Sequence, residues 1–189
     1  MSEKGLLIVI SGPSGVGKGT VIKELLSRNE GFRFSVSATT RHPRKGEQNG
    51  LNYRFVSKEQ FEIMIKKQEL LEYAVYSGNY YGTLSSEVDT LLDEGYHVLL
   101  DIEVQGALQV KKHRPDALML FIMPPSMDIL EDRLRERNTE TPENIKCRMD
   151  AASYELTLKD KYDYIIENNL LDDAVAFLEN VIIDRKSVV

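Results

Sequence analysis

The chain has 189 residues, enough for one α/β domain with a proper core that needs neither disulfides nor a structural metal. Its formal net charge of −6 argues against a nucleic-acid-binding protein, because such proteins usually carry a basic excess. The single cysteine, Cys147, cannot form an internal disulfide, and the apolar run near the N-terminus is too short for a signal peptide or a membrane span. We therefore expect a cytoplasmic protein that binds neither nucleic acid nor membrane.

The first predicted elements are a strand at 6–10, a glycine-rich turn and a helix near 18–28. This order predicts a phosphate-binding loop, because glycines allow the positive φ that points successive backbone N–H groups at phosphate oxygens, next to the positive end of a helix. Lys18 adds a mobile charge for the β and γ phosphates. A glycine-rich turn without a ligand is the alternative. The residues expected to bind ATP here are Gly12, Pro13, Ser14, Gly15, Val16, Gly17, Lys18, Gly19 and Thr20.

The loop departs from the usual pattern at Gly19, where most such loops carry the Ser or Thr hydroxyl that binds magnesium. Thr20 must then supply the hydroxyl, or water must replace it. Loops that read Gly-Lys-Gly-Thr are familiar from kinases that phosphorylate nucleoside monophosphates. The departure therefore narrows the expected class of protein to such kinases. It leaves the protein ligand of the metal open.

The rest of the chain alternates short apolar runs with helical patterns. Further strands are predicted near 97–101, 117–122 and 164–167, and helices near 104–112, 126–137, 143–159 and 171–183. This alternation predicts a parallel sheet covered by helices on both faces. Ligands gather at the C-terminal ends of such strands, so Asp101 is a candidate magnesium ligand, directly or through water. The alternative is that Asp101 caps the helix that follows.

Two segments interrupt the alternation. Residues 35–83 are rich in β-branched and aromatic residues, and a capping box at Ser57–Gln60 opens a helix, which predicts a small mixed α/β insertion. Residues 133–148 contain a turn-prone break at 138–142 between two helices, which predicts the hinge of a lid. Strands of the insertion are expected at 35–40, 53–56 and 70–76.

The insertion carries a specific motif in two stretches, Ser35–Tyr53 and Glu72–Thr83, with the spacing Thr-Thr-Arg…Arg-x-Gly-Glu…Tyr. With the phosphate loop, this motif closely resembles guanylate kinase over nearly the whole chain. The resemblance implies the P-loop nucleoside monophosphate kinase fold, in which helices flank a parallel five-stranded core sheet, with a small mixed α/β GMP-binding insertion and a helical lid. The implied parts of this single kinase domain are a core (1–34, 84–132 and 149–189), the insertion (35–83) and the lid (133–148).

Arg41 and Arg44 offer planar forked donors three residues apart, which suit a phosphate dianion better than the point charge of lysine. Guanine presents two adjacent donors, N1–H and the 2-amino group, and Glu72 is the candidate carboxylate that accepts both. The alternative for the two arginines is a solvated basic turn, and the alternative for Glu72 is an exposed carboxylate on a strand. The resemblance implies a GMP site made of Ser37, Arg41, Arg44, Tyr53, Glu72, Tyr81, Thr83 and Glu103.

Arg133 and Arg137 lie four residues apart on one predicted helix face, and Arg148 follows beyond the break. The resemblance implies that these three arginines and Lys18 stabilise the transferred phosphoryl group. It also implies that Arg137 and Asn168 contact the adenine of ATP. From spacing alone, the arginines would instead be ion-pair partners of acidic neighbours on a solvated helix.

The predicted reaction transfers the γ-phosphoryl group of ATP to GMP, giving ADP and GDP, with dGMP as an expected second acceptor and Mg²⁺ as cofactor. No general base is required, because a monophosphate has its second pKa near ~6 and is already largely ionised at neutral pH. Two alternatives stay open: a sister kinase with another acceptor, and a non-enzymatic guanylate-kinase-like binding module. The expected partners are the small molecules ATP and GMP, and the sequence does not indicate the oligomeric state.

Overall fold

The computed structural model describes residues 4–76, 78–136 and 141–187. Contacts between residues divide the chain into two compact units, each made of two segments. The first unit comprises Met1–Val9 and Gly31–Leu118, and the second comprises Ile10–Glu30 and Met119–Val189. The predicted division into core, insertion and lid stays a prediction.

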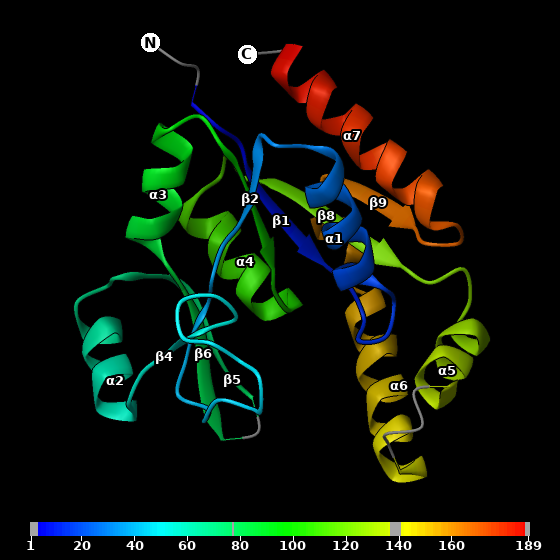
Figure 1. Cartoon of the computed structure of the whole chain (residues 1–189). Helices are drawn as coiled ribbons and strands as arrows, with labels where there is room; N and C mark the ends of the chain where they lie inside the picture. The colour runs from blue at the N-terminus through cyan, green and yellow to red at the C-terminus, as the bar shows by residue number, and fades with distance from the viewer. Residues whose placement is uncertain (1–3, 77, 137–140, 188–189) are drawn as a thin grey trace. The chain divides into compact units, whose positions relative to one another are not determined.

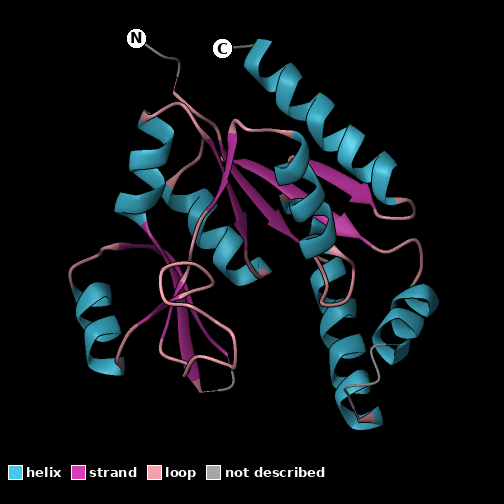
Figure 2. Ribbon diagram, viewed as in Figure 1, coloured by secondary structure: helices cyan, strands magenta, loops and turns pink. Residues whose placement is uncertain are grey.

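A five-stranded sheet with the order β2-β7-β1-β8-β9 confirms the predicted parallel α/β class (Figure 2). Its central strand, β1 (Leu7–Ser11), is buried at every residue, as expected for a strand covered on both faces. Flanking strands pair in parallel: Phe32 lies opposite His97 in one pair and Phe121 opposite Ile165 in another. The bounds of these strands are β2 (Phe32–Phe34), β7 (His97–Asp101), β8 (Leu118–Met123) and β9 (Tyr164–Glu167).

In the first unit, the chain leaves the core sheet after β2 and enters a second sheet with the order β4-β3-β6-β5 (Figure 1). The predicted strand at 35–40 is therefore wrong in its bounds. The backbone N–H of Ser35 still donates to the carbonyl of Leu99, whereas Ala38 already pairs with Gly82, so one β-branched run serves two sheets. The strands are β3 (Ala38–Thr39), β4 (Arg54–Phe55), β5 (Leu70–Tyr76) and β6 (Asn79–Leu84).

Three helices belong to the first unit: α2 (Lys58–Lys66), α3 (Ser85–Asp93) and α4 (Val104–His113). The predicted capping box of α2 is confirmed, because the Ser57 hydroxyl accepts from the Gln60 N–H and the Gln60 side chain accepts from the Ser57 N–H. Phe61 of α2 is fully buried and stacks on Tyr80, with ring centroids 5.0 Å apart. This contact joins α2 to the second sheet.

The second unit holds α1 (Lys18–Arg28), α5 (Met127–Glu136), α6 (Pro142–Leu156) and α7 (Leu171–Ser187). α7 packs against α1 and β9 (Figure 1). α6 ends earlier than the predicted 159, because the Thr157 hydroxyl donates to the carbonyl of Tyr154 and competes with the helical hydrogen bonds. Within the described residues, no helix has both the length and the apolar character that a membrane span needs.

Candidate nucleotide sites

The predicted phosphate loop lies in the second unit, between β1 and α1. Gly12, Gly15 and Gly17 have φ of 146°, 92° and 97°, so the predicted positive φ is confirmed. Gly17 is the N-cap of α1 and has left-handed geometry. The Lys18 ammonium folds back over the loop and donates to the carbonyls of Gly12, at 2.6 Å, and Pro13, at 3.3 Å. The loop thus surrounds a positive charge at the N-terminus of a helix, which suits a polyphosphate.

Asn168, which follows β9, holds this loop from the side. Its side chain is buried, and its amide donates to the carbonyl of Val16 at 2.8 Å. A Cβ at Gly17 would lie 2.6 Å from the same amide nitrogen, so the loop needs a glycine there for space as well as for φ. The predicted adenine contact of Asn168 stays a prediction, and the structure gives the residue a contact that the sequence did not indicate.

Two of the predicted lid arginines also contact the loop within the second unit. The Arg133 guanidinium donates to the carbonyls of Val16, at 3.4 Å, and Asn168, at 3.0 Å. Arg148 donates to the Ser14 hydroxyl at 2.7 Å. The alternative of a solvated ion pair is therefore wrong for Arg133, and it holds instead for Arg135, which pairs with Glu131 one turn away.

Arg137 and residues 138–140 of the predicted break at 138–142 lie outside the described residues. The second helix of the predicted lid starts as expected for a capped helix: the Thr141 side chain accepts from the Asn144 N–H, and Pro142 is the first helical residue. Gly19 and Thr20 are exposed residues in the first turn of α1.

The predicted acceptor site forms a cavity of about 350 Å³ in the first unit. All predicted GMP-binding residues except Thr83 line it, together with Asp101 and several residues that the sequence did not single out. The lining consists of Ser37, Arg41, Arg44, Glu47, Tyr53, Glu72, Ala74, Tyr76, Tyr81, Gly82, Asp101, Ile102, Glu103 and Gly106. This volume is at the lower end of the range typical of small-molecule sites.

Glu72, in the middle of β5, is a buried carboxylate with only 5% of its surface exposed. The exposed-carboxylate alternative is therefore wrong. Thr83 lies opposite Glu72 on β6, and its hydroxyl donates to Glu72 Oε1 at 2.7 Å. Burial raises the pKa of Glu72, while hydrogen bonds from the Thr83 side chain and backbone act in the opposite direction. The fully buried Thr83 thus contacts Glu72, and its predicted contact with the base stays a prediction.

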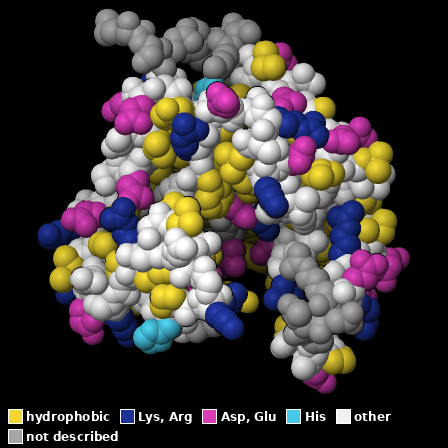
Figure 3. Space-filling view, in the orientation of Figure 1, with side chains coloured by type: hydrophobic (Ala, Val, Ile, Leu, Met, Phe, Trp, Pro, Cys, Tyr) yellow, Lys and Arg dark blue, Asp and Glu magenta, His cyan; other side chains and the backbone are white. Residues whose placement is uncertain are grey.

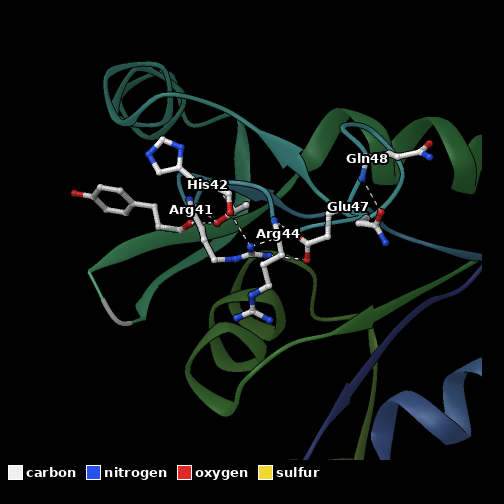
Figure 4. A network of polar contacts seen from close by, with 8 residues as sticks. Arg41, His42, Arg44, Glu47 and Gln48 are labelled. Carbon is white, nitrogen blue, oxygen red and sulfur yellow. Dashed lines mark hydrogen bonds and ion pairs between the residues drawn. The ribbon is translucent and has the colours of Figure 1, made fainter. Parts of the chain in front are cut away.

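Arg41 forms a two-pronged ion pair with Glu47, with contacts of 3.0 Å and 2.9 Å (Figure 4). Glu47 also accepts from the Arg44 backbone N–H at 2.7 Å. The hydrogen bond from Arg41 lowers the pKa of Glu47 most, and the hydrogen bond from the Arg44 N–H lowers it further. The Arg41 guanidinium lies 5.3 Å from the ring centroid of Tyr53, and the His42 ring points away from the pair. Glu47 thus sets the position of Arg41, a role that the motif contained but that spacing could not reveal.

Asp101 ends β7 and lines the same cavity. The capping alternative is wrong, because the N-cap of α4 is Glu103 and not Asp101. Acidic and basic side chains are interspersed on the face shown in Figure 3, outside the residues drawn in grey. The arginines of the cavity therefore form a local site and are not part of a broad basic surface on this face.

A phosphate loop on a parallel α/β sheet, with a second cavity lined by arginines and a buried carboxylate, is typical of P-loop nucleoside monophosphate kinases. The guanylate kinase family model matches residues 4–185. This chain belongs to the guanylate kinase family, as the motif predicted.

Relatives support this membership over nearly the full length. The guanylate kinase of Clostridium tetani is 52% identical over 184 residues, which cover 97% of this chain and 88% of the relative. That of Halalkalibacterium halodurans is 51% identical over 180 residues, which cover 95% and 88%. The crystal structure of guanylate kinase from Anaplasma phagocytophilum matches with a TM-score of 0.75 and 32% identity, over 96% of this chain and 86% of that chain.

We expect Glu72→Gln to raise the melting temperature at neutral pH. Because burial raises the folded-state pKa of Glu72, ionisation of this group is easier in the unfolded chain and destabilises the fold. This penalty is absent below the unfolded pKa of about 4.3 and grows as the pH rises through both pKa values. Melting curves from about pH 4 to about pH 8 should show the largest advantage of glutamine at neutral pH.

The matched control is Glu94→Gln, which changes an exposed carboxylate at the end of α3. The two variants should differ in their pH dependence. If both follow the wild-type curve at a constant offset, the ionisation of Glu72 does not destabilise the fold.

Proposed function

We propose that this chain transfers the γ-phosphoryl group of ATP to GMP, giving ADP and GDP, and that it also accepts dGMP. Membership of the guanylate kinase family supports the reaction class. The observation that carries the choice of acceptor is the buried Glu72 carboxylate in a cavity that also presents Arg41 and Arg44. Together these groups match the two ends of GMP, the base and the phosphate.

Glu72 would read the base. An ionised carboxylate accepts both N1–H and the 2-amino group of guanine, and Thr83 already fixes one of its oxygens. Adenine lacks this pair of donors and would leave a buried carboxylate poorly paired, at a cost on the order of 2–4 kcal/mol. Discrimination by tens- to hundreds-fold would therefore follow from Glu72, with Ser37 and Glu103 along the rest of the base edge.

Arg41 and Arg44 would grip the GMP phosphate with Tyr53 and Tyr81, whose rings meet edge to face at 6.0 Å. The Glu47 carboxylate uses only part of the five-donor guanidinium of Arg41 and fixes its plane. A pre-oriented fork loses less conformational entropy when it binds a phosphate than a mobile side chain does. The arrangement therefore favours a doubly charged phosphate over a neutral group.

On the ATP side, the loop N–H groups and Lys18 would bind the phosphates, and Arg133, Arg137 and Arg148 would stabilise the charge that develops on the transferred group. The reaction is an in-line displacement: a GMP phosphate oxygen forms the new bond to the γ-phosphorus, and the bond to the β–γ bridging oxygen breaks, which leaves ADP. The nucleophile is already ionised near neutral pH, so the protein positions it and supplies charge without a general base.

Mg²⁺ is the proposed cofactor. Proteins usually bind it through one or two carboxylates together with substrate phosphates, and the Asp101 carboxylate, directly or through water, is an oxygen donor of this kind. The hydroxyl of the exposed residue Thr20 is a second candidate, given Gly19. When bound, the ion supplies positive charge that neutralises the phosphates.

The test of this function is ADP release from ATP and magnesium, with GMP, dGMP, AMP, CMP and UMP offered separately as acceptors. We expect activity with GMP and dGMP alone. Glu72→Gln should raise the KM for GMP and lower the preference for GMP over AMP by tens- to hundreds-fold. Strong activity with another acceptor would indicate a sister kinase, and ATP binding without turnover of any acceptor would indicate a binding module.

Glu47→Gln should raise the KM for GMP about tenfold, equivalent to about 1.4 kcal/mol, with kcat and the KM for ATP little changed. The amide keeps the size of the side chain but leaves a single acceptor, so Arg41 loses its two-pronged partner. Steady-state kinetics with each substrate varied in turn measure the effect. Glu62→Gln on α2 serves as the control, and an unchanged KM for GMP would show that Glu47 only braces its loop.

Asp101→Asn should lower kcat, and extra magnesium should restore part of it, because the amide is a weaker ligand for a hard cation than the carboxylate. Turnover measured against magnesium concentration would reveal this as a shift of the half-saturating concentration. A variant with full activity at every magnesium concentration would remove Asp101 from the site.

A further inference from the structure

β5 is the edge strand of the second sheet, so one side of its backbone has no neighbouring strand. α4 packs against β5 and takes this place (Figure 1). The Gln109 amide accepts from the Tyr73 N–H at 3.2 Å and donates to the Tyr73 carbonyl at 2.9 Å. Nδ1 of His113 lies 2.9 Å from the Leu71 carbonyl. One side chain thus makes the pair of hydrogen bonds that a neighbouring strand would make.

These contacts bracket Glu72, because Leu71 and Tyr73 are its two neighbours in the chain. Gly106 lies one turn before Gln109 on α4, on the same face of the helix. A Cβ built at Gly106 would lie 2.6 Å from Glu72 Oε2, closer than real Cβ atoms approach an oxygen. The Glu72 carboxylate therefore lies between two neighbours: Thr83 of β6 binds Oε1, and Gly106 of α4 leaves room for Oε2.

The backbone does not explain the glycine at position 106. Gly106 lies inside α4 and is not among the glycines with positive φ, so any residue could adopt its conformation. Glycine is also a poorer helix former than alanine. The choice of glycine is consistent with a requirement for space, because the atom nearest to the position of a Cβ at residue 106 is Oε2 of Glu72.

We propose that α4 sets the selectivity for guanine: Gly106 keeps open the space for the Glu72 carboxylate, and Gln109 fixes the strand that carries it. Both are positioning residues that act through Glu72. The inference rests on the proposed GMP kinase function. It assigns part of the selectivity to Gly106 and Gln109 of α4, which would influence the base through Glu72.

The first test is Gly106→Ala. The added methyl group should push the carboxylate out of place, raise the KM for GMP at least about tenfold, and lower the GMP-over-AMP preference by a similar factor, with the KM for ATP unchanged. Gly31→Ala is the control, because a Cβ there meets nothing within 4 Å. A Gly106→Ala enzyme with wild-type KM and preference would overturn the role of Gly106.

A double-mutant cycle tests the route through Glu72 directly. Glu72→Asp shortens the side chain by one methylene and withdraws the carboxylate from the space beside residue 106. We expect this change to lower GMP selectivity less in the Gly106→Ala background than in the wild type. Strictly additive effects would mean that Gly106 does not act through Glu72.

The second test removes atoms and adds none, so it does not depend on whether the alanine at position 106 is tolerated. Gln109→Ala should lower GMP-over-AMP preference, whereas Gln105→Ala, at an exposed position of the same helix, should not. A merely structural role of Gln109 would lower the melting temperature without changing the preference, and this result would overturn its role. A wild-type enzyme inactive toward GMP would overturn the proposed function and this inference with it, whereas active wild type with unchanged variants would overturn the inference alone.

Discussion

The acceptor site depends on one buried carboxylate. Glu72 is nearly inaccessible to solvent, and burial alone would favour its neutral form. The hydrogen bond from Thr83 offsets part of this cost, and in the proposed function a base with two adjacent donors would offset more of it. A buried acceptor that is only partly satisfied gives strong discrimination, since the wrong base leaves it unpaired in a medium where an unpaired charge is expensive. The proposed selectivity and the expected destabilisation by Glu72 therefore have the same physical origin, which is the burial of an ionised carboxylate.

The phosphate loop follows a different rule. Lys18 donates to the carbonyls of Gly12 and Pro13, and Arg133 donates to those of Val16 and Asn168. Arg148 donates to the Ser14 hydroxyl. All of these acceptors are uncharged. A phosphate oxygen carries a negative charge that these acceptors lack, so phosphate oxygens compete well for the same cationic donors. These hydrogen bonds to uncharged acceptors hold the three cationic side chains near the loop. They are weak enough for a nucleotide to replace them.

Local sequence patterns predicted the corresponding parts of the structure correctly. The strand, turn and helix around Gly12–Lys18, the capping box of α2 and the strand-end position of Asp101 all depend on neighbours within a few residues. Arg133 shows where such reasoning fails, because local spacing favoured an acidic partner one turn away, whereas its contacts are Val16 and Asn168, far along the chain. The sequence around Gly106 and Gln109 gave no signal for their proposed role, because the residues that they contact lie in a strand about 35 residues earlier.

Arg41 and Arg44 have adjacent positions in the motif but different electrostatic settings. Arg41 already shares its charge with Glu47, so it brings geometry more than net charge to a bound phosphate. Arg44 contributes only its backbone N–H to Glu47, and its exposed side chain retains its full charge for an incoming anion. An arginine paired with Glu47 beside an exposed arginine combines orientation with attraction. Since a dianion that must attack in line needs both, the pair of arginines serves the proposed reaction better than two equivalent cations would.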